Sequence, residues 1–226
     1  MPFGNAHVAK LMDVLYENAA AANVGDAGGL QPSATAGSLY IALHTAEPGA
    51  GGTQSTNECN YTGYARVAVA RSGSGWDRSG QTATNAAQVA FGACTAGANK
   101  ATHWSVGLAS SGATELCTFG PLKSGTKVFT AAASDTLTIP GLAFVADEEV
   151  IVEAIPGVSL PTGLAAGVYY VLAPSGDTCT LSTTVGGAAV NITAAGAGKI
   201  SKSLALSISS GITPSFAIGA LAQTWG

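Results

Sequence analysis

The sequence predicts a mainly β protein: a β-sandwich or barrel-like host domain with one N-terminal helix, plus an inserted small β-module. Three observations carry this prediction. Short apolar stretches alternate with a period of two, turn-forming residues separate them at near-regular spacing, and one stretch near the start repeats its apolar residues at helical spacing. A chain of 226 residues is long enough for one large all-β domain or for two modest ones.

The composition is apolar and poor in charge. Hydrophobic residues make up 47% of the chain and charged residues only 10%, against roughly 25% in ordinary soluble domains. So few charges protect a surface weakly against self-association, which favours a subunit of an assembly. The nine Lys and Arg residues form no cluster that could neutralise a row of phosphates, so we expect no nucleic-acid partner.

No membrane partner is expected either. The first residues, Met1 to Asn5, lack the basic start and apolar stretch of a secretory signal. The uncharged tail from Ser203 to Gly226 is interrupted by Gly211 and Pro214, and its short apolar runs alternate like strands.

One helix is predicted, near the start of the chain. Six residues recur there at helical spacing: Val8, Leu11, Met12, Leu15, Tyr16 and Ala19. Asn5 can cap this helix, and Gly25, Gly28 and Gly29 form a hinge after it. We expect its apolar face to pack on the sheet or on another subunit, which makes Leu11, Met12 and Leu15 the candidate subunit or lattice contacts.

Strands are expected to follow from residue 38 onwards. In residues 38–45, Leu39, Ile41 and Leu43 share one face of a strand by their alternation. Further strands are predicted at 64–71, 87–91, 103–109 and 115–119, and a turn around Trp76, which neighbouring glycines bracket.

The character of the sequence changes near Lys123. Residues 123–202 are predicted to form the inserted β-module, and residues 1–122 and 203–226 the discontinuous host domain. Candidate strands of the module are 136–139, 149–154, 168–172, 179–182 and 190–193. An insertion whose ends lie close together costs little closure entropy, so a folded module can sit on a host loop.

A long combined motif carries a family resemblance. It consists of LYIALHTAEPG at 39–49, Asn57-Glu58 and YTGYARVAV at 61–69, and it continues through residues 102–107 and 211–216. This combination resembles a widespread family of tailed-bacteriophage virion proteins, whose members are labelled head-decoration, tail-fibre or minor structural proteins. The resemblance covers residues 1 to about 122 and 203 to 226. It implies a virion protein that is assembled in the bacterial host cytoplasm.

No catalytic, cofactor-binding or metal-binding residue is predicted. His44 beside Glu47 could form an acid-base pair, but a strand-end histidine bonded to a neighbouring loop is the preferred interpretation. The acidic run Asp147 to Glu149 is interpreted as a solvated turn and strand start rather than a calcium site.

Two further groups of residues have a structural interpretation. Tyr61, Tyr64 and Trp76 could form a sugar-binding patch, but core or interface positions are preferred. The four cysteines, widely spaced, are expected to be reduced and buried or half-buried: Cys59, Cys94, Cys117 and Cys179.

These features predict a non-enzymatic structural protein without cofactors, for which two functions remain open. The first is a capsid decoration, or cement, protein that stabilises the head, with the major capsid protein and further copies of itself as partners. The second is a tail-associated fibre or adhesin, with a host-surface glycan as its partner. A depolymerase is disfavoured, since no paired carboxylates and no long repeat are found.

Overall fold

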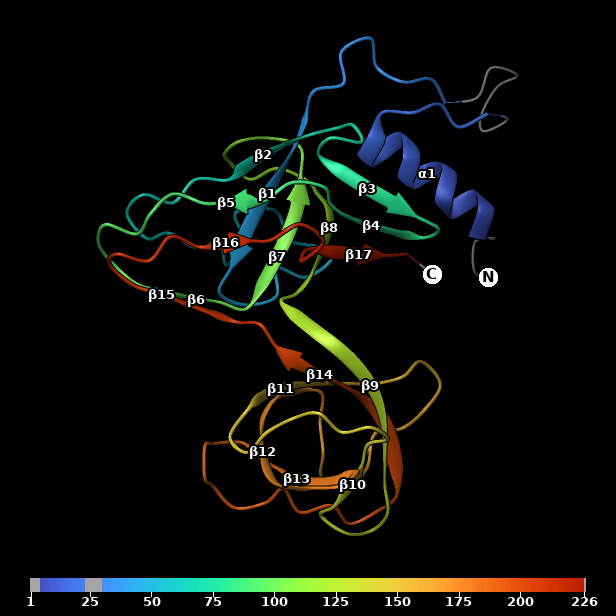
Figure 1. Cartoon of the computed structure of the whole chain (residues 1–226), viewed down its shortest axis with the longest axis vertical. Coiled ribbons are helices and arrows are strands. Elements are labelled where there is room, and N and C mark those ends of the chain that lie inside the picture. Colours follow the sequence, from blue (N-terminus) through green and yellow to red (C-terminus); the bar gives the residue numbers. More distant parts are fainter. Residues whose placement is uncertain (1–4, 23–29, 226) are drawn as a thin grey trace. The chain divides into compact units, whose positions relative to one another are not determined.

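A computed structural model describes residues 5–22 and 30–225, and the chain divides into two compact units. Unit 1 comprises Met1–Leu122 with Ala205–Gly226, and unit 2 comprises Lys123–Leu204. Antiparallel strands dominate both units, and a helix lies at the N-terminal end of the described chain (Figure 1). The predicted mainly β fold class is thereby confirmed.

Unit 1 contains a four-stranded antiparallel sheet in the order β2-β1-β7-β8. Its strands are β1 (Ser38–His44), β2 (Val67–Ala70), β7 (His103–Gly107) and β8 (Leu116–Pro121). The predicted alternation in β1 is confirmed, because Leu39, Ile41 and Leu43 are fully buried. On the opposite face Ala42 and His44 are also buried, so the end of β1 is covered on both sides.

Three smaller sheets bring the C-terminal segment back onto the first half of unit 1. They pair β17 (Ala222–Thr224) with β4 (Thr82–Asn85), β16 (Ser215–Phe216) with β5 (Val89–Ala90), and β15 (Leu206–Ile208) with β6 (Asn99–Ala101). On its other side β4 pairs with β3 (Trp76–Ser79). The turn predicted around Trp76 lies directly before it, because the N–H groups of Gly75 and Trp76 both donate to the Ser72 carbonyl and Trp76 then begins β3. A second turn follows at Gly80, whose φ of 59° suits glycine.

The helix α1 (Asn5–Glu17) lies along β3 (Figure 1). Asn5 is its first residue rather than its cap, and the predicted glycine hinge lies outside the described residues. The last carbonyls of a helix have no partner within it. Here Arg71 supplies one, because its guanidinium donates to the carbonyls of Val14 and Leu15 at 2.7 and 2.9 Å. An ion pair between Asp13 and Arg78 links the helix to β3.

Unit 2 is a closed barrel in the order β10-β13-β12-β11-β14-β9. Its strands are β9 (Lys123–Ala131), β10 (Leu137–Thr138), β11 (Glu149–Glu153), β12 (Gly167–Ser175), β13 (Thr178–Ser182) and β14 (Gly196–Ser203). The core of the barrel includes Phe129, Val150, Val171, Leu181 and Ile200. Closure matters because a barrel leaves no unpaired strand edge.

Closure of the barrel depends on two strands that the sequence pattern did not indicate, β9 and β14. They pair along most of their length, and Lys123 lies opposite Ser203. The two ends of unit 2 therefore lie side by side. The strand predicted at 190–193 is wrong: Ile192 is buried, but its N–H donates to the Asp135 carboxylate at 2.9 Å instead of joining a ladder.

We predict that unit 1 folds without unit 2. Removal of residues 123–204, with a short Gly-Ser turn joining Leu122 to Ala205, should leave a soluble protein with one cooperative thermal unfolding transition. The physical reason is that each unit has its own buried core and that unit 2 begins and ends on paired strands. An insoluble product, or one that unfolds without cooperativity, would show that the two units depend on each other.

Candidate functional site: a buried polar network in unit 1

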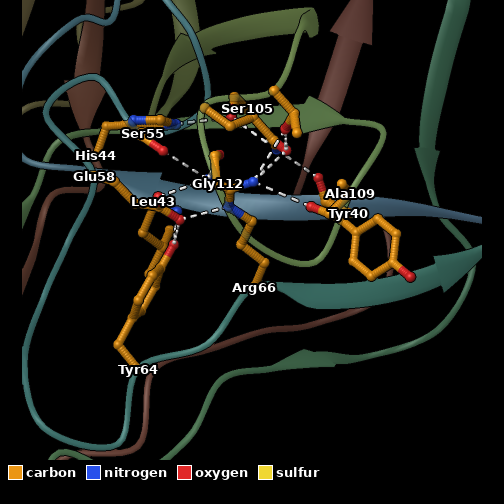
Figure 2. A network of polar contacts seen from close by, with 12 residues as sticks. Tyr40, Leu43, His44, Ser55, Glu58, Tyr64, Arg66, Ser105, Ala109 and Gly112 are labelled. Atoms are coloured by element: carbon orange, nitrogen blue, oxygen red, sulfur yellow. Dashed lines mark hydrogen bonds and ion pairs between the residues drawn. The ribbon is translucent and has the colours of Figure 1, made fainter.

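The motif that carries the family resemblance folds into a network of buried polar side chains (Figure 2). β1 ends at His44 and β7 carries Ser105 opposite Ala42. The loop after β1 supplies Glu58, and Arg66 immediately precedes β2. Segments that are separate in the sequence therefore meet at one end of the sheet.

Arg66 is the centre of this network, and only 8% of its surface is exposed. Its Nε and Nη2 donate to the two carboxylate oxygens of Glu58 at 2.7 and 2.8 Å. Its Nη1 and Nη2 also donate to the carbonyls of Ala109 and Gly112, at 3.1 and 2.7 Å. The hydrogen bond to Glu58 raises the pKa of Arg66, and the bidentate geometry is the strong form of this ion pair.

Glu58 accepts a further hydrogen bond, from the Tyr64 hydroxyl at 2.9 Å. The same hydroxyl accepts the backbone N–H of Leu43 at 3.0 Å, so it connects the carboxylate to β1. Burial raises the pKa of Tyr64, which keeps its proton available for Glu58. The charge of this carboxylate, whose side chain is 16% exposed, is thus balanced by one cation and one hydroxyl donor.

Gln54 joins the ion pair to the sheet and has no exposed surface. Its Oε1 accepts from Arg66 and from the Thr114 hydroxyl, both at 3.1 Å. Its Nε2 donates to the carbonyl of Tyr40 at 2.9 Å. A Cβ on Gly107 would lie 2.1 Å from the Gln54 carboxamide carbon, so only glycine fits at this position of β7.

The hydrogen bonds of His44 fix its tautomer. Its Nδ1 lies 2.8 Å from the carbonyl oxygen of Thr56, which can only accept, so Nδ1 carries the proton. Its Nε2 is then an acceptor, and the Ser105 hydroxyl donates to it at 2.7 Å. The preferred interpretation of His44, a strand-end histidine bonded to a neighbouring loop, is confirmed. Glu47 is exposed, and its charge acts on His103 instead.

The sequence-predicted contact residues on α1 differ in exposure. Leu11 and Leu15 are partly exposed. Met12 has no exposed surface, so its prediction as a subunit or lattice contact is wrong. It faces the interior of unit 1 because helical spacing places it with Val8 and Tyr16 on the buried side of the helix.

The remaining candidates have structural positions. Tyr61 and Trp76 are buried and do not form one patch: Tyr61 packs against Tyr64, and Trp76 against Tyr16. The four cysteines are free, and all are buried or half-buried as expected.

The acidic run Asp147 to Glu149 lies at the turn and strand start predicted for it. Its three carboxylates bond, respectively, to the Gly186 N–H, to Lys202 and to the hydroxyl of Ser203. Among the described residues, no group of three or more His, Cys, Asp or Glu side chains could hold a metal ion. Within the same ranges no helix is long and apolar enough to cross a membrane.

The network holds loops in place, and external reactants cannot reach its interior. His44, Gln54 and Ser105 each have 0% exposed surface, so no substrate from solution reaches the Ser105 hydroxyl. Arg66 instead binds carbonyls of the 108–114 loop and a side chain of the 45–60 loop at once. Arg66 thereby links these two loops to each other, in addition to the backbone bond between Cys59 and Leu43 that joins the 45–60 loop to β1.

The fold and the network define a mainly β protein whose buried charges fix its own loops. The comparison with family models identifies the family. The model of the family described as podophage GP4 fiber I protein gp80 matches residues 12–144, more than half of the chain. The chain belongs to this family and is therefore a structural protein of a phage virion. No curated protein matches the chain. The matched range contains every residue of the buried network and ends within unit 2.

We predict that Arg66→Met destabilises unit 1 strongly. The substitution leaves the Glu58 carboxylate, whose side chain is only 16% exposed, without its cation, and breaking a buried ion pair costs up to roughly 3–5 kcal/mol of unfolding free energy. Urea unfolding followed by tryptophan fluorescence measures the loss. Arg78→Met is the control within unit 1, since the Arg78 side chain is 23% exposed against 2% for Arg66, and its loss of stability should be smaller. Equal losses in both variants would contradict the special role of Arg66.

We also predict that unit 1 loses stability as the pH falls below about 6.5. Burial lowers the pKa of His44 and of His103 from 6.5. The unfolded chain therefore binds more protons in this range, and the free energy of unfolding decreases as the pH is lowered through 6.5. Unfolding midpoints measured in urea across this range test the prediction. His44→Gln should show a shallower dependence, whereas an unchanged slope would exclude His44 as a source.

Proposed function

We propose that the chain is a non-enzymatic component of a podophage fibre. The observation that supports this proposal is the family match, because the family is described as a fibre protein. The match begins within α1 and includes the sheet and the buried network, so the part of unit 1 that depends on Arg66 is the part that the family shares. The charge-poor surface fits a subunit that other virion proteins cover.

The alternative, a capsid decoration protein bound to the major capsid protein, rests on the same composition. A charge-poor β protein suits either location, and no feature of the described residues favours the head. The description of the family favours a fibre, so decoration is kept only as an alternative outcome of the experiment below.

We propose that the two units have different roles within such a fibre. Unit 1 contains the family motif and is proposed to attach the chain to the virion. Unit 2 is a closed barrel with a core of its own, and most of it lies beyond the family match. We propose that this barrel is displayed and contacts the host surface, where a glycan is the expected ligand.

A fibre of this kind is proposed to contain several copies of the chain, with α1 contributing to their contacts. One face of the helix is used inside unit 1, but Leu11 and Leu15 keep part of their apolar surface exposed. Burial of such side chains between copies would stabilise an oligomer.

We predict that the protein lies on the fibres of intact particles. Gold-labelled antibody should decorate the tail region in electron micrographs, and quantitative mass spectrometry should give a copy number typical of tail components. Tail-less heads should lack the protein. A copy number close to that of the major capsid protein, with retention on tail-less heads, would overturn the fibre proposal in favour of decoration.

The same particles test the proposed role of α1. Leu15→Asp should reduce incorporation of the protein, because it places a charge on the partly exposed face of the helix. Val128→Asp is a matched control, since Val128 is an exposed valine of unit 2 and a change there should leave incorporation unaltered. Normal incorporation of folded Leu15→Asp protein would show that α1 does not contribute to the contacts between copies of the chain.

A further inference from the structure

The C-terminal segment of unit 1 has no charged residue from position 203 to position 226. Residues 79–99, which are also uncharged, pair with it, and backbone hydrogen bonds join the two stretches from Gly211 to Trp225. The chain has a net charge of −4, so two copies repel each other least where such uncharged stretches meet. This charge distribution favours a second copy of the chain as the partner of this part of unit 1.

The strand β16 in this segment has an unpaired edge. It pairs with β5 on one side only (Figure 1). The N–H of Phe91 donates to the Pro214 carbonyl, and hydrogen-bonded pairs alternate along an antiparallel ladder. The backbone groups of Pro214 and Phe216 therefore face β5, whereas those of Ser215 point away from it. Charged side chains usually protect such an edge from pairing, and this segment contains none.

Two isoleucines lie at equal distances in sequence on either side of Ser215. Ile212 precedes it by three residues and is 45% exposed, and Ile218 follows it by three residues and is 70% exposed. Alternation along an extended segment places both side chains on the same face. A single chain therefore leaves two apolar side chains uncovered, one at each end of the free edge.

The turn that carries Ile218 is fixed from inside unit 1. Asn85 has no exposed surface. Its side-chain amide donates to the Ala217 carbonyl at 2.8 Å, and its own carbonyl accepts the Gly219 N–H at 2.9 Å. A residue that is held in place before binding loses little conformational freedom on association, so Ile218 is preorganised for a contact.

We propose that two copies of the chain pair through the free edge of β16, antiparallel and about a two-fold axis at Ser215. Ser215 of each copy then exchanges both backbone hydrogen bonds with the partner's Ser215. Residues equally far from Ser215 in opposite directions lie opposite each other, so Ile212 of each copy packs against the partner's Ile218. The pair thus covers the side chains that one chain leaves exposed. The inference rests on the proposed function, in which several copies assemble.

Cysteine variants test the register of this pairing. Ile212 and the partner's Ile218 form a non-hydrogen-bonded pair, whose Cα atoms lie about 4.5 Å apart, within reach of a disulfide. A mixture of Ile212→Cys and Ile218→Cys proteins should therefore give a covalent dimer on a non-reducing gel after mild oxidation. All proteins carry Cys94→Ala, since Cys94 bonds to Ile212 through its backbone and its thiol would compete.

Each cysteine variant alone is the control for the mixture. Two copies of the same position lie about 20 Å apart in this register, so either variant alone should remain uncrosslinked. Crosslinking of one variant alone to the same extent as the mixture, or no crosslinking in the mixture, would overturn the pairing.

Sedimentation equilibrium of the purified full-length chain tests the pairing without any crosslink. The wild-type chain should be a dimer at micromolar concentration. Ile218→Glu should raise the dissociation constant by at least about 100-fold, because both contacts would bury an unpaired carboxylate. Val185→Glu is the matched control, since Val185 is an exposed valine of unit 2 and its substitution should leave the dimer intact.

The result is separate from the location of the chain in the virion. A monomeric or trimeric wild-type chain would overturn the inference, because an edge that pairs with itself joins only two copies. Equal dissociation constants for folded Ile218→Glu and wild-type protein would overturn it as well. A location on the head would contradict the fibre proposal alone, since the dimer is measured in solution.

Discussion

A guanidinium group inside a protein has to be paired on every side, because moving an ion out of water costs several kcal/mol. Arg66 meets this requirement with the Glu58 carboxylate, the Gln54 amide oxygen and carbonyls of the 108–114 loop. Neither the 45–60 loop nor the 108–114 loop has an extended strand ladder of its own. Besides backbone bonds such as that from the Cys59 N–H to the Leu43 carbonyl, the positions of both loops therefore depend on this one buried cation.

The same requirement explains why the family motif is long and contains many polar residues. Tyr64 donates to Glu58, Gln54 bridges Arg66 to the sheet, and Gly107 leaves the space that Gln54 occupies. Buried polar networks specify one arrangement only when every member is satisfied, so a change at one position affects the others. Unit 2 has no comparable requirement. Its barrel closes through backbone pairing and an apolar core, which suits a module added to an existing domain.

Local patterns in the sequence predict part of this structure. Alternation of apolar residues identifies β1 and its core-facing Leu39, and helical spacing identifies α1. The strands β9 and β14 show no such pattern. They are stabilised by pairing with each other rather than by alternation of large apolar residues. The same limit applies to Met12: spacing alone does not say which side of an apolar helix faces its own sheet.

The buried network was likewise outside the reach of pattern reasoning. Arg66 and Gln54 are ordinary polar residues in sequence, and only tertiary contacts bring Gln54 to Arg66 and to Ser105, 51 positions further on. The sequence contains one signal for it. Arg66 is a charged residue within an apolar, charge-poor motif, and the whole chain has only nine basic residues. His44 was predictable because its strand and the loop that it contacts adjoin in sequence.

Hydrogen exchange of the Arg66→Lys variant tests the central role of this cation most directly. Lysine keeps the charge but not the planar fork that binds Glu58 and Gln54 together. The account predicts faster exchange at the amides of Gln54 and Cys59, which bond to Thr114 and Leu43, and unchanged exchange in the barrel of unit 2. Unchanged protection of both amides in the folded variant would contradict the claim that Arg66 holds the two loops on the sheet.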